Sequence, residues 1–437
     1  MKITPKMVKD KLDAAISALT DNIWLFADNP KSDLTKDRKL PADSLLRLLL
    51  KFGGKSLQSE LSANYLPPRK IPQSVPTKSA FSQQRKKLLW EGCYVLLRYF
   101  TDSLPYMKTF EGYRLFACDG STVPIPRNED EEDYSVVTRK DRKSFNQLHI
   151  NGLFDILNRV FLDCIIDPGA HIRERDAMIK MVNRLEDTFM AIILADRGYE
   201  GYKDIAHLIE SRLNFLIRGK DLDSNGFLHT LKLPADGEID IDVDKILTFD
   251  RSICNENDAF VKVYPRNFDL MGPSGTYRIQ FRLVRIQLDD GSYECLVTNL
   301  PRDQFPLRKL KKLYHLRWGI ENAYRDLKYS VDLLHFHGKS AQAVLQEVLC
   351  SMTMFNFCAY LCVHADILHV HSGSKYRYKV NFANAVGPCR SFLHGSIDET
   401  ELLERLRLAP TPIRPNRHSP RHRLKEQSSR EFNYRAS

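Results

Sequence analysis

The chain has 437 residues, of which 43% are hydrophobic and 27% charged, and its formal net charge is +10 at pH 7. This composition excludes a mainly disordered, collagen-like or coiled-coil protein, and the length predicts two or three structural units. The excess of basic residues favours an anionic partner, and nucleic acid ahead of a membrane surface.

The cysteines and the apolar segments indicate the reducing cytosol. None of the nine cysteines forms a Cys-x2-Cys pair, which argues against a zinc ribbon. The segment Met1–Asp28 alternates charged and short apolar stretches, unlike a signal peptide. The most apolar window, Val348–Val370, contains polar residues and predicts a buried helix rather than a membrane span. We therefore predict a cytoplasmic protein with no membrane partner.

The first 105 residues are predicted to be helical. Leucines recur at helical spacing over Ala42–Phe52, and a second helix, Ala80–Tyr99, follows a start signal at Pro76 and Thr77. A Pro-rich linker, Leu66–Pro76, separates the two helices.

A short basic helix is predicted over Thr77–Leu88. Its mixture of glutamines and basic side chains suits the DNA major groove. A solvated face of a helical bundle explains the same composition equally well. The candidate DNA contacts in this helix are Lys78, Arg85 and Lys86.

From Tyr113 the pattern changes to apolar runs of strand length. Strands in succession, followed by strands that alternate with helices, predict an α/β fold in which a mixed sheet is flanked by helices. The predicted strands are Tyr113–Cys118, Leu148–Leu157, Val160–Ile166, Met190–Ala195 and Phe215–Arg218, and the helices are Arg173–Thr188 and Tyr202–Arg212.

Residues 220–302 interrupt this pattern. Turn signals and alternating polarity predict a β-rich insertion with paired strands at Tyr277–Leu288 and Tyr293–Thr298. Helical character returns at Pro306 and continues to about Leu408. The basic segment 411–437 is predicted to be a disordered tail.

Two acidic residues follow predicted buried strands. Asp119 follows Leu115–Cys118, and Asp196 follows Ile192–Ala195. An acid at the carboxyl end of a buried strand is exposed at the sheet edge, where α/β active sites are built. A turn former or helix cap is the alternative for either residue alone. The occurrence of two such acids favours a site.

A third acid lies on the predicted helix Leu313–Tyr329. At about 100° per residue, four polar side chains fall within a sector of roughly 60°, beside an apolar stripe. They are Tyr314, Arg317, Glu321 and Lys328. Ion pairs on a solvated helix are the alternative, but this mixture of side chains favours a functional edge beside the sheet.

The spacing Tyr314-x2-Arg317-x3-Glu321-x6-Lys328 matches the Tyr-Arg-Glu-Lys signature of the insertion-sequence 4 family of DDE transposases. The motifs that begin at Asp119 and Asp196 also resemble that family's first two acid motifs, and the β-rich insertion is similarly placed. The resemblance covers roughly residues 80–365.

The resemblance implies a ribonuclease-H-like catalytic core interrupted by the insertion, with helical N- and C-terminal regions. It implies that Asp119, Asp196 and Glu321 are catalytic and hold two Mg²⁺ ions, for which Mn²⁺ would substitute. The remaining signature residues would contact the DNA backbone beside the cleaved strand; they are Tyr314, Arg317 and Lys328.

One family feature is missing from this chain. In the family, an aromatic residue of the insertion, usually Trp, stacks on a flipped base. Here the tryptophans, at positions 24, 90 and 318, lie outside the insertion. Tyr293 is the substitute candidate, since any flat ring can stack on a base. A strand-surface tyrosine is the alternative.

Two further groups have weaker signals. Arg173, Glu174 and Arg175 lie within the predicted core region and are minor candidates for positioning DNA. The histidines near positions 335 and 364 have no recognisable metal-ligand spacing, so a structural role is favoured for them.

We therefore predict six regions: 1–105, which binds DNA ends; 106–219, the first part of the core; 220–302, the insertion; 303–340, the core helix with the Glu; 341–410, a possible dimer contact; and 411–437, the tail. The predicted protein is a bacterial, nucleoid-associated transposase that acts as a synaptic homodimer. It would bind terminal inverted repeats, cleave at the element ends and join the 3′-hydroxyls to target DNA. The alternatives are a metal-dependent nuclease of the same fold and a catalytically silent DNA-binding relic.

Overall fold

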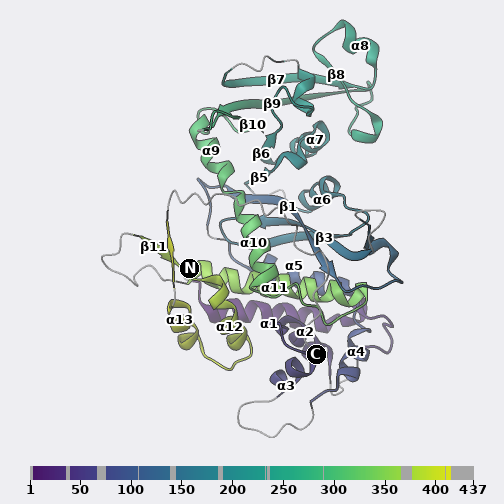
Figure 1. The fold of residues 1–437 in the computed structure, drawn as a ribbon, viewed down its shortest axis with the longest axis vertical. Coiled ribbons are helices and arrows are strands. Elements are labelled where there is room, and N and C mark those ends of the chain that lie inside the picture. The colour runs from purple at the N-terminus through teal and green to yellow at the C-terminus, as the bar shows by residue number, and fades with distance from the viewer. Residues whose placement is uncertain are drawn as a thin grey trace.

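The computed structural model describes residues 3–35, 40–65, 75–106, 108–137, 144–185, 190–231, 233, 237–288, 290–365, 376–408 and 410–414. Most of the predicted linker Leu66–Pro76 and most of the predicted tail 411–437 lie outside these residues. Figure 1 shows an elongated molecule with the insertion at one end, the core in the middle, and the N- and C-terminal helices at the other end.

Ten strands of the described chain form one mixed sheet. In its core part, three strands are joined in antiparallel order and two further strands run parallel to the first of them. The resulting order β4-β3-β1-β5-β6 is the ribonuclease-H-like arrangement that we predicted. These strands are β1 (Arg114–Ile125), β3 (Phe145–Asp155), β4 (Val160–Pro168), β5 (Ala191–Ala195) and β6 (Asn214–Gly219), and a short β2 (Ser135–Val136) pairs with β3.

Residues 220–302 extend this sheet. Strand β10 (Tyr293–Thr298) pairs antiparallel with β6 on one side and with β9 (Thr276–Gln287) on the other, which confirms the predicted strand pair. Strand β9 in turn pairs with β7 (Ile239–Thr248), which is followed by α8 (Arg251–Glu256) and β8 (Phe260–Lys262). The sheet therefore runs without a break from the core into the insertion (Figure 1).

The two sides of β5 face different helices because strand residues alternate between faces. Ile192 and Leu194 pack with Leu310 and Leu313 in one buried cluster. Ile193 belongs to the main core. Helix α6 (Glu174–Val182) precedes β5, and α7 (Tyr202–Glu210) connects β5 to β6. Helix α9 (Leu307–His315) follows β10.

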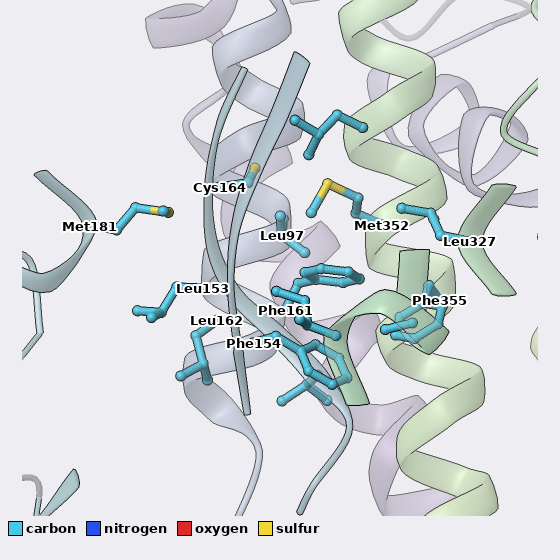
Figure 2. Close-up of a cluster of buried hydrophobic side chains, with 14 of the residues drawn as sticks. Leu97, Leu153, Phe154, Phe161, Leu162, Cys164, Met181, Leu327, Met352 and Phe355 are labelled. Atoms are coloured by element: carbon cyan, nitrogen blue, oxygen red, sulfur yellow. The ribbon is translucent and has the colours of Figure 1, made fainter. Parts of the chain in front are cut away.

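The terminal regions are mainly helical and pack around α11 (Ala341–His364). The C-terminal region also holds a strand pair, β11 (Arg377–Lys379) and β12 (Thr411–Ile413), so the predicted disordered tail is wrong for its first three residues. Figure 2 shows side chains of α5, the core strands, α10 and α11 meeting in one apolar cluster, among them Leu97, Phe161, Leu327 and Met352. Helix α11 is long and apolar enough to cross a membrane, but 94% of its most apolar window is buried inside the protein, as predicted for a core helix. The other helices are α1 (Pro5–Asp21), α2 (Ala42–Lys51), α3 (Leu57–Tyr65), α4 (Lys78–Arg85), α5 (Trp90–Ser103), α10 (Trp318–Tyr329), α12 (Phe382–Leu393) and α13 (Glu399–Arg407).

Two helices that we expected to be continuous are interrupted. The predicted helix Ala80–Tyr99 is divided into α4 and α5, because Leu88 between them forms a β-bridge with Ala27. The predicted helix Leu313–Tyr329 is divided into α9 and α10. At the junction the Arg317 amide donates to the Tyr314 carbonyl, a tightened turn that keeps right-handed helical dihedrals.

Candidate active site

Asp119 and Asp196 are neighbours on adjacent parallel strands. Cys118 of β1 pairs with Ala195, the last residue of β5, so the two aspartates follow at the same level. Strand β1 continues beyond Asp119 to Ile125 because it remains paired with β3. The expectation that Asp119 ends its own strand is therefore wrong. It is the parallel partner, β5, that ends there and opens the edge of the sheet.

Each aspartate is held by a nearby glycine amide. The Gly120 N–H donates to Asp119 Oδ1 over 2.9 Å, and the Gly198 N–H donates to Asp196 Oδ1 over 2.8 Å. Asp196 thus caps the short 3₁₀ helix Arg197–Tyr199, which was the alternative considered for this residue. Each bond uses one carboxylate oxygen and leaves the second available to a ligand.

Glu321, on α10, is linked to Asp119 through Arg317. The Arg317 Nη2 donates to Glu321 Oε1 over 2.7 Å, and its Nη1 lies 3.8 Å from Asp119 Oδ2. The Arg317 side chain is only 6% exposed. Its Nε and Nη1 atoms are buried and have no hydrogen-bond acceptor among the described residues. The guanidinium therefore stands between two acids with part of its donor capacity unused.

The pKa of Asp119 is affected by burial and by the two other acids. Burial raises the pKa of Asp119 to about 6, and the charges of Asp196 and Glu321 act in the same direction. The Arg317 charge and the Gly120 amide oppose the rise in this pKa. The Asp119 carboxylate is therefore repelled by both other acids.

The other signature residues lie on α9 and α10, on either side of Arg317. Tyr314 is buried, its ring centre is 5.9 Å from the Arg317 guanidinium carbon, and burial raises its pKa to about 12. The Lys328 Nζ donates to the Thr122 carbonyl of β1 over 2.8 Å, and partial burial lowers the pKa of its ammonium. All four residues therefore follow α9 and α10 alongside the sheet edge.

Tyr293 lies at the start of β10. Because β10 runs antiparallel to β6 and β5 runs parallel to β6, this end of β10 shares the sheet edge with Asp196. The guanidinium carbon of Arg285 lies 3.6 Å from the centre of the Tyr293 ring and covers one ring face. Stacking of a base on the tyrosine remains a prediction.

Of the three predicted DNA contacts in α4 and its C-cap, two are on the surface. Lys78 and Lys86 are exposed. Arg85 is only 4% exposed and donates to Gln346, Glu347 and the Ala343 carbonyl of α11. The prediction of a DNA contact for Arg85 is therefore corrected, because its guanidinium is directed into the protein and joins two helices.

Tyr324 is a site residue that the sequence did not reveal. Its hydroxyl lies 3.0 Å from both the Asp119 and the Ile150 carbonyl oxygens, so it fastens α10 to β1 and β3 one turn beyond Glu321. Gly152 makes room for this hydroxyl, since a Cβ there would lie 2.6 Å from it. No local pattern distinguishes Tyr324 from other core tyrosines, although its position three residues after Glu321 places it near the site.

The three carboxylates are suited by chemistry to a hard divalent cation, but their side chains do not surround an ion position. Mg²⁺ prefers carboxylate oxygens and retains several waters, which three acidic side chains at one sheet edge permit. Among the residues that the structure describes, no three His, Cys, Asp or Glu side chains converge closely enough to hold an ion. Arg317 stands between two of the carboxylates, so it must shift for a cation to reach both.

A family model described as "Transposase DDE domain" matches residues 110–357. The match spans Asp119, Asp196 and Glu321 and more than half of the chain. The chain belongs to this family. DDE transposases generally use divalent metal ions, and this DDE transposase carries a donor set of the matching chemical class.

A comparison with solved structures found the synaptic complex of the piggyBac transposase with hairpin DNA, determined by cryo-EM. The two chains are 8% identical, and the alignment covers 93% of this chain and 82% of that chain with a TM-score of 0.45. This likeness is too distant to support an argument about function. No curated protein matched the transposase.

Proposed function

We propose that this DDE transposase is of the insertion-sequence 4 type, binds the terminal inverted repeats of its element, cleaves at the ends and joins the 3′-hydroxyls to target DNA. The observation that carries the proposal is the register of Asp119 and Asp196 at the end of β5, with Glu321 connected to Asp119 through Arg317.

Each residue of the site has a role in this proposal. Asp119, Asp196 and Glu321 would hold two Mg²⁺ or Mn²⁺ ions. Such ions would activate the attacking water or 3′-hydroxyl and would stabilise the leaving oxygen. After a shift out of its buried position, Arg317 would grip a phosphate through Nε and Nη1, which make no hydrogen bond with the described residues. The Lys328 ammonium would attract the DNA backbone as a point charge. The Tyr314 hydroxyl would form a hydrogen bond with the same DNA backbone.

The remaining regions supply the partners. Lys78 and Lys86 would contact the element end, residues 341–410 would join two copies in a synaptic homodimer, and the basic tail would add salt-sensitive affinity for DNA. These tasks would be divided among the six regions 1–105, 106–219, 220–302, 303–340, 341–410 and 411–437. All nine cysteines are free thiols, which supports action in the reducing bacterial cytoplasm.

The test is cleavage and strand transfer on a labelled duplex that ends in the inverted repeats flanking the coding region, in Mg²⁺ and in Mn²⁺. Wild type is compared with Asp119→Asn and Glu321→Ala, and with Glu404→Gln, which removes an exposed carboxylate on α13. We expect site-specific 3′-hydroxyl ends and joined product from wild type and Glu404→Gln only.

Two results would overturn this proposal in different ways. Cutting without end specificity or joining would identify a nuclease of the same fold. Specific binding of the repeats without cutting in either metal would identify a DNA-binding relic.

A further inference from the structure

Glu174, the first residue of α6, lies against the glycines that follow both aspartates. A Cβ on Gly120 would stand 2.6 Å from Glu174 Oε1. A Cβ on Gly198 would stand 3.9 Å from Glu174 Oε2 and 3.0 Å from Asp196 Oδ1. The Glu174 carboxylate therefore lies beside the two backbone segments whose amides hold Asp119 and Asp196.

His149 of β3 holds Glu174 in this place. The His149 side chain is 5% exposed, and its Nε2 lies 2.9 Å from Glu174 Oε1. Neither ring nitrogen makes a hydrogen bond of regular geometry with the described residues, so this ion-pair contact is the polar interaction shown for the ring. The same Nε2 would lie 2.1 Å from a Cβ on Gly120, which explains why a glycine follows Asp119.

Two of the cations that line the groove beside Glu174 are paired with other carboxylates. Arg175 is engaged with the buried carboxylate of Asp204. Lys203 pairs with Asp176 and Asp269. The contact with His149 lowers the pKa of Glu174, so its carboxyl is ionised at neutral pH.

Glu174 also faces open space next to the groove that Asp196 lines. It lines a surface groove of about 400 Å³, and Asp196 lines a second groove of about 530 Å³. Both grooves include Gly198, so they adjoin at the residue whose amide donates to Asp196. A solvated ion held by the aspartates would therefore have Glu174 within reach of its water shell.

We propose that Glu174 is a fourth carboxylate of the active site, which accepts hydrogen bonds from water on a divalent ion held by Asp119 and Asp196, and that His149 is its positioning residue. The inference rests on the proposed metal chemistry of this transposase. Mg²⁺ keeps several waters, and groups that orient the ligands of a metal contribute about 10–100-fold to affinity.

The test measures Mn²⁺ binding to the full-length, metal-free protein from the electron paramagnetic resonance signal of free Mn²⁺. Glu174→Gln keeps the size of the side chain and removes its charge. Asp176→Asn, in the same first helical turn, removes an exposed charge and is the matched control. We expect Glu174→Gln to weaken Mn²⁺ binding about tenfold, His149→Gln to weaken it several-fold, and Asp176→Asn to match wild type.

The reference variant is Asp196→Asn. If it weakens Mn²⁺ binding while folded Glu174→Gln binds as tightly as wild type, the present inference is overturned and the proposed function stands. If wild type binds no Mn²⁺, both are overturned. Should Glu174→Gln fail to fold, Glu174→Asp keeps the charge but withdraws it by one methylene. Wild-type affinity in that variant would equally contradict a water-mediated contact.

Discussion

Arg317 bonds to Glu321 over 2.7 Å, in the place that a divalent cation has to reach. Its second terminal nitrogen is 3.8 Å from Asp119, so one guanidinium offsets the repulsion between two acids of the site. In the metal-free protein this side chain supplies the positive charge that the ions supply in the proposed active complex. Under the proposed mechanism, Arg317 and the metal would therefore compete for Glu321.

Arg317→Ala should separate metal binding from cleavage. Because the competing cation is gone, we expect DNA-free protein to bind Mn²⁺ several-fold more tightly, while cleavage falls on the order of 100-fold through loss of the phosphate contact. Arg325→Ala, on the exposed side of the same helix, is the control. Weaker Mn²⁺ binding by Arg317→Ala in a titration would show that the guanidinium supports the ion site instead of competing for it.

Asp119 should make the metal-free protein less stable as the pH rises. Its folded pKa of about 6 exceeds the ordinary value of 3.8, so the native state binds more protons than the unfolded state between these values. The stability it contributes is fully present below pH 3.8 and is lost as the pH rises through 6. The buried charge then costs about 3 kcal/mol.

Asp119→Asn should consequently raise the Tm in EDTA at pH 7.5, and this gain should disappear near pH 4. Thermal unfolding across this range measures both, with exposed Asp303→Asn as the control. An Asp119→Asn gain that persists unchanged at pH 4 would argue against titration of this carboxyl as its cause.

Tyr324→Phe should loosen the attachment of the Glu321 helix. It removes the hydroxyl shared by the Asp119 and Ile150 carbonyls, at about 1–2 kcal/mol of unfolding free energy and a few degrees of Tm. Cleavage should also fall, because small displacements of a catalytic group lower the rate. Tyr329→Phe, 71% exposed on the same helix, should change neither quantity. Equal Tm values for the two variants would contradict the anchoring role.

Arg85 and Lys86 should behave oppositely although they are adjacent. Arg85→Ala leaves Glu347 charged and buried, which should lower the unfolding free energy by about 3–5 kcal/mol. Lys86→Ala should leave stability within about 0.5 kcal/mol and reduce the salt dependence of DNA binding by about one phosphate contact. Chemical denaturation and binding at several salt concentrations measure these effects. A stable Arg85→Ala with weakened DNA binding would restore the original prediction for this residue.

The sequence predicted the elements that local patterns determine. The five apolar residues of β5 are all buried and end directly before Asp196, as their pattern indicated. The alternation over β9 and β10 likewise identified a strand pair. The spacing from Tyr314 to Lys328 placed the signature residues along one edge, because a tightened turn at Arg317 preserves the helical direction.

The sequence could not predict features that depend on distant partners. Asp119 lies inside its strand because β3 stays paired with β1 after the apolar run has ended. Arg85 turns inward because Glu347, far away in the sequence, provides a buried counter-charge. The contact of His149 with Glu174 joins a strand to a helix without a periodic signal. Each of these placements is decided by tertiary packing rather than by local propensity.

Strand β10 belongs to the insertion but also completes the pairing of the core sheet. Val297 pairs with Ile217 of the core on one side and with Leu283 of the insertion on the other. Excising residues 220–302 would leave β6 paired with β5 alone and expose its other edge, an unpaired apolar edge to which strands of other molecules could add. Strand β10 is therefore not dispensable for the core sheet. A transposase shortened by removal of the insertion would therefore have to keep β10 or carry another strand that pairs with β6.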